Sequence, residues 1–485
     1  MKNQKLIIGL LVAVIILLGG NMYFLFKGEG NTIKDDIQNE NPPIVNNNEE
    51  KVDNSGENIK PSGDTLITSG EINPSVIVKE EVKNEPEKDE IPVKKEYDVI
   101  VFGAEAEGIM TAISAARNNL KVLLVEKRDG PGGLMIYSML NTIDMNMNDE
   151  GVLLSQGIFE EFYAKLNNRN SFDVEVAQKA FEEMLEAEEN ITIMYNVKEY
   201  TVGSTGTSIE YAVIDGEKYT ARTYIDCTQD ADITVAAGGE YVVGWEDVNE
   251  KNRSMSATLV IHMDNVDWEK ACETIRIENR PNTGYSDRGI WAFGNITETY
   301  VPLQTNMRLK ALNIGRQNDG SVLINSLQII NADMLNADAK ARAYAKCVDE
   351  AEHLAKFIKE NVPGFENATL VGTAPELYVR ETRHIIGEYQ LTVKDMLEST
   401  YSRSSIGLAS YPIDVQTTSI YDYGYIIGAP NQYYIPMGTI IPKGFTNLLT
   451  IGRSGSYTSI AAGSARVIPT GMTLRRISRY NVGCC

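Results

Sequence analysis

The alternation of apolar and polar positions predicts a β-α-β unit that begins near residue 97. Residues 97–102 (YDVIVF) form a compact apolar run, which is typical of a buried strand. Residues 109–117 (IMTAISAAR) are rich in alanine and place apolar side chains at helical spacing. Residues 120–126 (LKVLLVE) form a second apolar run that ends in an acid. This order of strand, helix and strand predicts an α/β fold with a Rossmann-like domain.

Further along the chain, helical and strand-like patterns follow one another. Residues 152–189 carry apolar and acidic side chains at helical spacing, and strand-like runs cover residues 191–219. Residues 256–263 alternate like a strand. Residues 339–361 have helical periodicity, and this helix is expected to end before Pro363, because proline does not continue a helix.

This succession predicts two folded domains, one inserted into the other. We expect the Rossmann-like domain to comprise residues 96–240 and, after the chain returns to it, residues 379–474. An α+β substrate domain would occupy residues 241–378 between these two parts. Residues 475–485 form an atypical tail that has neither the glycines nor the apolar face of a packed helix.

A different pattern marks the N-terminus. Residues 6–26 form an uncharged apolar run of 21 residues, long enough to cross a bilayer as a helix. Lys2 and Lys5 precede it, so the positive-inside tendency predicts that residues 1–27 are a membrane anchor and that the folded domains lie outside the cytoplasm. A cleaved signal peptide is the alternative, because the run contains two adjacent small glycines.

The segment after the anchor, residues 28–95, is expected to be a disordered acidic stalk. It is rich in Asn, Glu, Asp, Lys and Pro and poor in aromatic residues, so it cannot bury enough apolar surface to offset its chain entropy. Much of the acidity of the chain, whose net charge is −22, lies in this N-terminal third. Such a balance argues against a nucleic-acid partner, because phosphate backbones recruit clustered Lys and Arg.

Cysteine and histidine usage predicts no metal site. The five cysteines contain no C-x-x-C pair of the kind found in redox dithiols, zinc sites and iron–sulfur clusters. The chain has only three histidines, so a multi-histidine site would need nearly all of them.

The glycines between the first strand and its helix carry the most specific chemistry. Gly103 and Gly108 bracket the sequence GAEAEG, in which the first glycine permits a tight turn and the last lets the helix pack closely on the strand. The helix N-terminus would then present free N–H groups to a pyrophosphate, and Glu126 at the end of the second strand would accept hydrogen bonds from ribose hydroxyls. Glu105 stands where the usual pattern has its middle glycine, and its carboxylate would be repelled by phosphate unless it points away. An ordinary crossover that binds no nucleotide is the alternative.

Four segments together resemble a known family. Residues 103–135 contain the glycine pattern and a second glycine loop, and residues 221–232 read ARTYIDCTQDAD. Residues 379–389 read VRETRHIIGEY, and residues 447–466 begin NLLTIGR. These segments resemble FAD-dependent oxidoreductases with a glutathione-reductase-type fold, the group related to the flavin subunit of heterodisulfide reductase.

The resemblance implies FAD as the cofactor and assigns residues to its site. The implied cofactor contacts are Gly103, Glu105, Gly108, Glu126, Lys127, Gly132, Gly133, Asp226, Thr228, Gly452, Arg453, Ser456 and Arg466. The implied catalytic residues are Arg380, Arg383, His384 and Tyr389, the arginines as anion-binding groups and the other two as proton donors. Arginine–glutamate pairs that only join the domains are the alternative interpretation of this arginine-rich segment.

Taken together, these patterns predict an enzyme that transfers a hydride between a small molecule and flavin at the outer face of the cell membrane. Neither the substrate nor the electron acceptor is indicated. The alternative is a flavin-free or catalytically inactive surface binding protein on the same fold, suggested by Glu105 and by the tail. Related chains continue after Met472 into a glycine- and alanine-rich helix, which this chain lacks, so weak FAD binding is expected.

Overall fold

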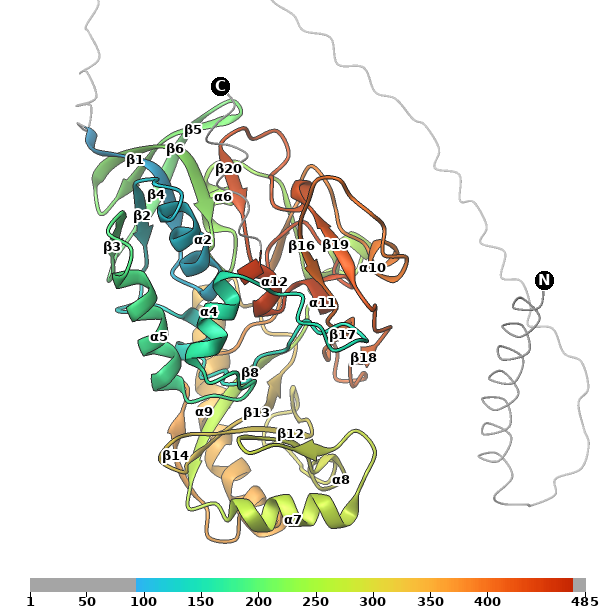
Figure 1. Ribbon diagram of the computed structural model, residues 1–485. Coiled ribbons are helices and arrows are strands. Elements are labelled where there is room, and N and C mark those ends of the chain that lie inside the picture. Colours follow the sequence, from blue (N-terminus) through green and yellow to red (C-terminus); the bar gives the residue numbers. More distant parts are fainter. Residues whose placement is uncertain (1–92, 474–485) are drawn as a thin grey trace, which may run out of the picture. The chain divides into compact units, whose positions relative to one another are not determined.

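The computed structural model describes residues 93–473 (Figure 1). The expected anchor, residues 1–27, most of the expected stalk and the tail, residues 475–485, lie outside the described residues. The first strand begins at Val93, inside the segment 28–95 that the composition assigned to the stalk. Within the described part of the chain, no helix combines the length and the apolar character needed to cross a bilayer.

The predicted β-α-β unit is confirmed as β1 (Val93–Phe102), α2 (Ala106–Ala116) and β2 (Val122–Val125). The two strands pair in parallel, as a crossover helix requires. α2 begins three residues earlier than the apolar pattern predicted, because its first turn lies within the glycine-rich loop. Its N-cap residue, Glu105, makes no side-chain capping hydrogen bond.

A seven-stranded sheet forms around this unit, in the order β3-β2-β1-β6-β5-β4, with β20 also paired to β6. Its other strands are β3 (Ile191–Met194), β4 (Tyr200–Thr205), β5 (Ser208–Ile214), β6 (Glu217–Asp226) and β20 (Leu448–Thr450). One edge of β6 pairs with two different strands. Its first residues pair antiparallel with β5, whereas its last three, Tyr224–Asp226, pair in parallel with β20. A strand from the C-terminal part of the chain therefore completes a sheet that begins at residue 93.

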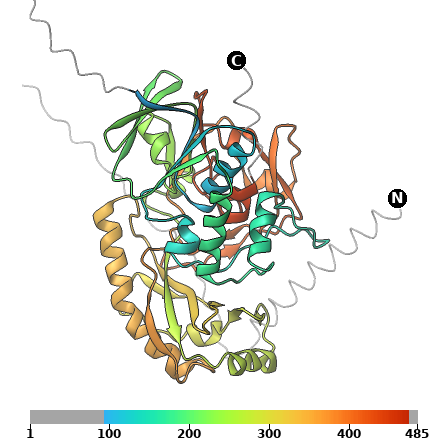
Figure 2. The same ribbon diagram turned by 60° about the vertical axis from the view of Figure 1, so that its left-hand side comes forward.

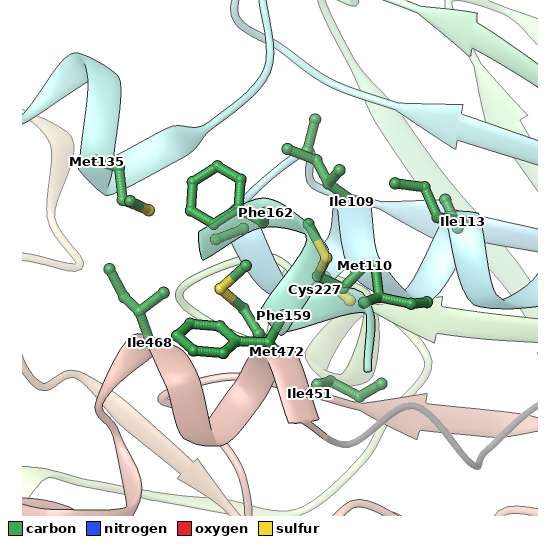
Figure 3. Packing of buried hydrophobic residues seen from close by; sticks show 14 of the residues in the cluster. Ile109, Met110, Ile113, Met135, Phe159, Phe162, Cys227, Ile451, Ile468 and Met472 are labelled. Atoms are coloured by element: carbon green, nitrogen blue, oxygen red, sulfur yellow. The ribbon is translucent and has the colours of Figure 1, made fainter. Parts of the chain in front are cut away.

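Apolar side chains cover both faces of this sheet, as expected for buried parallel strands. Val99 and Val101 of β1 share a core with α2, whereas Ile100 and Phe102 share a second core with β4 and β5. α3 (Gly133–Tyr137), α4 (Ile158–Lys165) and α5 (Val174–Glu186) pack against α2 on the first face. Figure 3 shows part of this core, with Ile109, Met110, Ile113, Met135, Phe159, Phe162, Cys227, Ile451, Ile468 and Met472 labelled. Full burial of one large apolar side chain stabilises the fold by about 1.5–3 kcal/mol.

A second sheet lies within residues 241–378, the range predicted for a substrate domain, and has the order β14-β8-β13-β12-β10-β9, with β11 paired to β13. Its strands are β8 (Ala257–Asp264), β9 (Gly284–Tyr285), β10 (Gly289–Ala292), β11 (Met307–Leu309), β12 (Leu312–Arg316), β13 (Val322–Ile329) and β14 (Thr369–Thr373). Its helices are α7 (Trp268–Glu278), α8 (Gly294–Thr297) and α9 (Ala337–Asn361). β8 and α9 confirm the predicted strand and helix of this region. α9 packs on β8, β13 and β14, and Figure 2 shows it along one side of this sheet.

The remaining elements lie where the chain leaves and rejoins the first sheet. They are α6 (Asp232–Ala236), β7 (Tyr241–Val243), η1 (Gly244–Val248), β15 (Arg383–Ile385), α10 (Val393–Leu397), β16 (Ser405–Ala409), β17 (Asp414–Val415), β18 (Tyr425–Ile426), β19 (Tyr433–Pro436), η2 (Met437–Thr439), α11 (Ala462–Ala465) and α12 (Ile468–Thr473). β7 pairs with β15, so the outgoing and returning segments are joined by a two-stranded ladder.

Candidate functional site

The carboxyl ends of four parallel strands meet at one edge of the first sheet. The Gly103 N–H donates to the Val125 carbonyl, and the Cys227 N–H donates to the Phe102 carbonyl, which places the loops after β1, β2 and β6 side by side. The Ile451 N–H donates to the Asp226 carbonyl and adds the loop after β20. In doubly wound folds, ligands bind at this edge of the sheet.

Two glycines shape the loop between β1 and α2. Gly103 has a φ of +95°, and a Cβ there would lie 2.6 Å from the Cys227 carbonyl oxygen. A Cβ at Gly108 would lie 2.0 Å from the Gly103 carbonyl oxygen. Both positions therefore exclude any side chain. The loop delivers the N-terminus of α2, whose first-turn N–H groups have no acceptor within the helix, to the carboxyl edge of the sheet.

The loop borders a cavity of 370 Å³, which we call the loop cavity. Its wall includes the predicted cofactor residues Gly103, Glu105, Glu126, Lys127, Thr228 and Arg453. Tyr200 of β4, in the first sheet, and Lys340 of α9, which packs on the second sheet, contribute to the same wall. The cavity therefore lies at the carboxyl edge of the first sheet, where doubly wound folds bind ligands.

Glu126 lies at the end of β2 in the wall of the loop cavity. Its Oε2 accepts a hydrogen bond from the Ala104 N–H at 2.6 Å, and its Oε1 accepts one from the Arg128 N–H at 2.9 Å. Burial raises the pKa of this carboxyl above its usual range, partly offset by the charge of Arg128. The side chain thus fixes the glycine loop, and its remaining lone pairs suit ribose hydroxyls.

The guanidinium of Arg128 contacts three carboxylates, one of which is that of Glu126. Its guanidinium lies 2.9 Å from Glu105 and 3.4 Å from Glu126, and it forms a bidentate pair with Glu376 at 2.9 and 2.8 Å. The second oxygen of Glu105 accepts the Leu134 N–H at 2.9 Å. Glu105 therefore remains in the wall of the loop cavity, with its charge balanced by Arg128 and a backbone donor. Arg128 is thus a single cation within ion-pair distance of three acids.

Glu107, in the first turn of α2, was not predicted from the sequence. Burial, with a smaller contribution from the charge of Glu105, raises its pKa to about 8. A Cβ at Gly471 of α12 would lie 2.2 Å from its Cγ, and a Cβ at Gly452 would lie 3.8 Å from its carboxyl group. A glycine after β20 and a glycine within α12 thus make room for this buried acid.

Two further cavities continue from the loop cavity. A narrow one of 20 Å³, the connecting cavity, shares Leu134, Gln229, Val379 and Arg453 with the loop cavity. A larger one of 170 Å³, the polar cavity, shares Leu140, Thr142, Asp144, Tyr378, Arg380 and Arg466 with the connecting cavity. The three form one line that runs from the glycine loop to the second sheet. A planar ring would fit into the connecting cavity only if the side chains that line it moved.

Arg380, Arg453 and Arg466 all line this succession of cavities. Nη1 of Arg380 donates to the Ser256 carbonyl at 2.9 Å and to Thr258 Oγ1 at 2.6 Å, and its guanidinium lies over the Tyr378 ring. Burial lowers the pKa of Arg380. Arg466 binds the Tyr378 hydroxyl at 3.0 Å.

The hydrogen bonds of the Arg453 guanidinium go to other groups of the protein. It pairs with Asp230 at 2.6 Å and donates to the carbonyls of Gln229 and Val379. It thereby joins the loop after β6 to the returning segment, as the alternative interpretation of the arginines allows.

Several other predicted residues lie away from the three cavities. Arg383 and His384 belong to β15: the first binds the Asp230 carbonyl at 2.6 Å, and the second contacts Glu381 at 2.9 Å in the interior. Tyr389 is 37% exposed, and burial together with a hydrogen bond to Asp395 raises its pKa to about 12. The Ser456 hydroxyl accepts the Gly387 N–H at 3.1 Å.

The predicted residues that remain support the loops. Asp226 accepts hydrogen bonds from the N–H and the hydroxyl of both Thr228 and Thr234, and burial raises its pKa to about 6. Gly132 and Gly133 have φ values of +105° and +46°, and a Cβ at Gly133 would collide with the Glu105 carboxylate. These contacts hold the two glycine loops together.

Many polar residues that line the cavities were not predicted from the sequence, among them Glu107, Arg128, Asp144, Lys310, Tyr378 and Asp414. Arg128 and Tyr378 adjoin predicted residues, so their neighbours were a usable signal. Lys310 and Asp414 had none, because only the tertiary fold brings them to the cavity. Within residues 93–473, no group of three or more His, Cys, Asp or Glu side chains is arranged to hold a metal ion.

The geometry of the site fits a dinucleotide. Two glycines admit no Cβ, a helix N-terminus faces the cavity edge, and an acid stands at the end of the second strand. Among these residues, Gly103, Glu126 and the N-terminus of α2 would hold the phosphates and the ribose.

The sequence profile of a protein family described as FAD dependent oxidoreductase matches residues 98–474. No curated protein matches the chain. A geranylgeranyl bacteriochlorophyll reductase-like protein from Thermoplasma acidophilum is 13% identical over 80% of both chains, with a TM-score of 0.38. A triple mutant of the flavin-dependent brominase Bmp2 is 12% identical over 80% of this chain and 81% of that one, with a TM-score of 0.40. These TM-scores are too low to support an inference about function. The profile match spans most of the chain, and the protein therefore belongs to the FAD-dependent oxidoreductase family, with FAD as its cofactor.

Proposed function

We propose that the protein transfers a hydride between FAD and a small molecule held in the polar cavity. The observation that carries this proposal is the line of cavities, in which Leu134 and Arg453 border both the first and the second, and Arg380 and Arg466 border both the second and the third. A cofactor that starts at the glycine loop and extends along this line would bring its far end to the polar cavity.

Each part of the chain has a separate task in this proposal. When bound, FAD supplies the hydride chemistry. Gly103 and the N-terminus of α2 bind the diphosphate, and Glu126 orients the ribose. Arg453 holds the loop after β6 against the returning segment, so that the walls of the connecting cavity keep their spacing.

Proton transfer is assigned to the polar cavity rather than to β15. Asp144 lines both the connecting and the polar cavity, and burial raises the pKa of this carboxyl, with Asp414 adding to the rise and Arg466 opposing it. A carboxyl with a raised pKa is suited to exchange protons near neutral pH. His384 and Tyr389 do not border either cavity, so we propose Asp144 in their place.

We further propose that the folded domains work outside the cell membrane. Support comes from the apolar run of residues 6–26 and from Lys2 and Lys5 before it. The substrate would then be a molecule met outside the cytoplasm, and the electron acceptor would have to be reachable from there.

The purified protein tests the redox proposal directly. A yellow protein whose visible flavin bands bleach when a substrate is added without oxygen would support it. The Asp144→Asn variant should then bind FAD normally but bleach far more slowly, whereas an Asp287→Asn variant, at an exposed position in the turn between β9 and β10, should behave like the wild type. A colourless protein that takes up no added FAD would favour a flavin-free binding protein instead.

A further inference from the structure

Three basic side chains from different segments converge on the polar cavity. Lys310 follows β11, Arg380 precedes β15 and Arg466 follows α11. Arg466 has Asp414 at 3.9 Å. Lys310 and Arg380 have no carboxylate at ion-pair distance among residues 93–473.

The hydrogen bonds that these two cations make do not go to carboxylates. Lys310 donates to the Tyr423 carbonyl, and Arg380 donates to the Ser256 carbonyl and the Thr258 hydroxyl. All of these acceptors are neutral. Burial is the largest influence on the pKa of both cations and lowers it, and nearby acids, Asp414 among them, offset only part of that shift. An anion in the cavity would reverse that penalty.

Three residues that line the same cavity carry buried polar atoms without a hydrogen-bond partner. These atoms are Asn325 Oδ1 and Gln328 Oε1, both on β13, and Arg466 Nε. Gln328 is only 1% exposed, and its amide nitrogen is fixed on the Gln416 side chain at 3.0 Å. Buried polar atoms are rarely left unpaired, and here two acceptors and one donor adjoin a ligand-sized space.

The charge and size of the cavity limit what it can hold. Three cations face two acids, Asp144 and Asp414, so the wall is positive by about one charge when all of them are ionised. This balance suits one carboxylate better than a phosphate dianion. The volume of 170 Å³ is below the ~300–1,000 Å³ of typical pockets for drug-sized ligands.

We propose that the polar cavity binds a small carboxylate that also carries hydroxyl or amino groups. The carboxylate lies between Lys310 and Arg380, and the hydroxyl or amino donors reach Asn325 and Gln328. As a statement about the substrate, this inference rests on the proposed redox function. As a statement about binding, it stands on the cavity alone.

Matched ligands of equal skeleton test the inference by calorimetry and by thermal shift, on the full chain and without oxygen. Glycerate carries both groups, glycerol lacks the carboxylate, and propionate lacks the hydroxyls. Serine, tartrate and gluconate, each with its neutral analogue, extend the series to amino groups and longer chains. At least one hydroxy or amino carboxylate should bind ten times more tightly than its neutral analogue. The inference is overturned if none does, or if glycerol phosphate binds more tightly than every carboxylate.

Variants test the carboxylate-binding part and the hydroxyl-binding part of the site separately. Lys310→Gln should weaken carboxylate binding at least tenfold, and Arg276→Gln, on the exposed face of α7, should leave it unchanged. Asn325→Ala should weaken the hydroxy carboxylate but not propionate, a difference that a general loss of structure would not produce. Equal weakening of both ligands by Asn325→Ala would contradict the assigned orientation.

The visible flavin spectrum of the same samples separates this inference from the proposed function. A yellow protein that binds no carboxylate would overturn the inference and leave the redox function in place. A colourless protein that binds carboxylates with the expected preference would support the cavity and overturn the redox function.

Discussion

The carboxylate of Glu105 lies 2.9 Å from the guanidinium of Arg128, in the wall of the cavity that the glycine loop borders. An acid at the middle position of the glycine pattern is therefore compatible with the fold, because a cation and the Leu134 N–H hold it. The arrangement also occupies Arg128, which would otherwise be available to a diphosphate.

Removal of the Glu105 charge should strengthen FAD binding. Glu105→Gln keeps an acceptor for the Leu134 N–H, removes one negative charge from the cavity wall and releases part of Arg128. We expect FAD to bind up to about tenfold more tightly, about 1.4 kcal/mol, measured by quenching of flavin fluorescence. The gain should shrink as salt is added. Glu273→Gln, on exposed α7, is the matched control, and unchanged or weaker binding by Glu105→Gln would contradict the prediction.

The same substitution at Glu126 should have the opposite effect. Glu126→Gln also removes a negative charge from the cavity, but this carboxylate is expected to accept ribose hydroxyls and it holds the Ala104 N–H. We expect FAD binding to weaken by ~1.5–3 kcal/mol, the range for a hydrogen bond to a charged group. If both variants strengthen FAD binding, charge alone controls the cavity and Glu126 has no specific contact.

Glu107 should make stability depend on pH. Its pKa rises from 4.5 to about 8 in the folded protein, so the folded state keeps a proton that the unfolded state loses. The free energy of unfolding therefore falls as the pH rises from about 4.5 to about 8, by up to about 1.4 kcal/mol per pH unit from this group. Glu107→Gln should gain stability relative to the wild type over that interval, in urea unfolding at several pH values. A constant difference across the interval would show that Glu107 is already ionised when folded.

His384 is expected to support the fold rather than the chemistry. Its Nε2 contacts Glu381 at 2.9 Å, and the other Glu381 oxygen accepts the Met255 N–H at 2.6 Å. His384→Ala would leave a buried acid short of a partner, which costs about 1–3 kcal/mol or more. Urea unfolding should show that loss, and FAD affinity measured at low denaturant should stay within twofold. His353→Ala on α9 is the comparison, and lost flavin reduction with intact stability would return His384 to the active site.

The expected membrane topology can be checked on intact cells. Protease added outside should cut within residues 28–92 and release a soluble fragment that contains both sheets. The reason is that a polar segment of this composition is open to proteolysis, whereas the folded strands and helices are not. If the chain stays intact until the cells are lysed, the folded domains are on the inner side.

Local patterns predicted the β-α-β unit because each of its signals lies within the segment concerned. The apolar run of residues 97–102, the spacing of residues 109–117 and the acid at position 126 need no information from elsewhere. The start of α2 was misplaced because Ala106 and Glu107 carry no capping signal; the helix begins there because the glycine loop turns the chain. β8 and α9 were found for the same local reasons.

The polar cavity could not be predicted in this way. Asn325 and Gln328 appear as ordinary positions of a strand, and Lys310 follows a three-residue strand with no pattern of its own. Their meeting with Arg466 depends on the packing of two sheets whose strands are far apart in sequence. The catalytic role of Arg383 and His384 was predicted from the resemblance of residues 379–389 to a family segment, and it stays a prediction; the structure adds that this segment forms a ladder with β7.

The shared edge of β6 makes the first sheet depend on a distant part of the chain. Tyr224 and Leu448 are paired neighbours that are 224 positions apart, so an emerging polypeptide has an unpaired strand edge in its first sheet until residues 448–450 have been synthesised. Closing so long a loop slows folding, and an open strand edge invites pairing with other chains. A polypeptide released before residue 448 would keep that edge open and would lack Gly452 and Gly471, which adjoin Glu107. We therefore expect flavin binding to begin only after β20 and α12 have joined the first sheet.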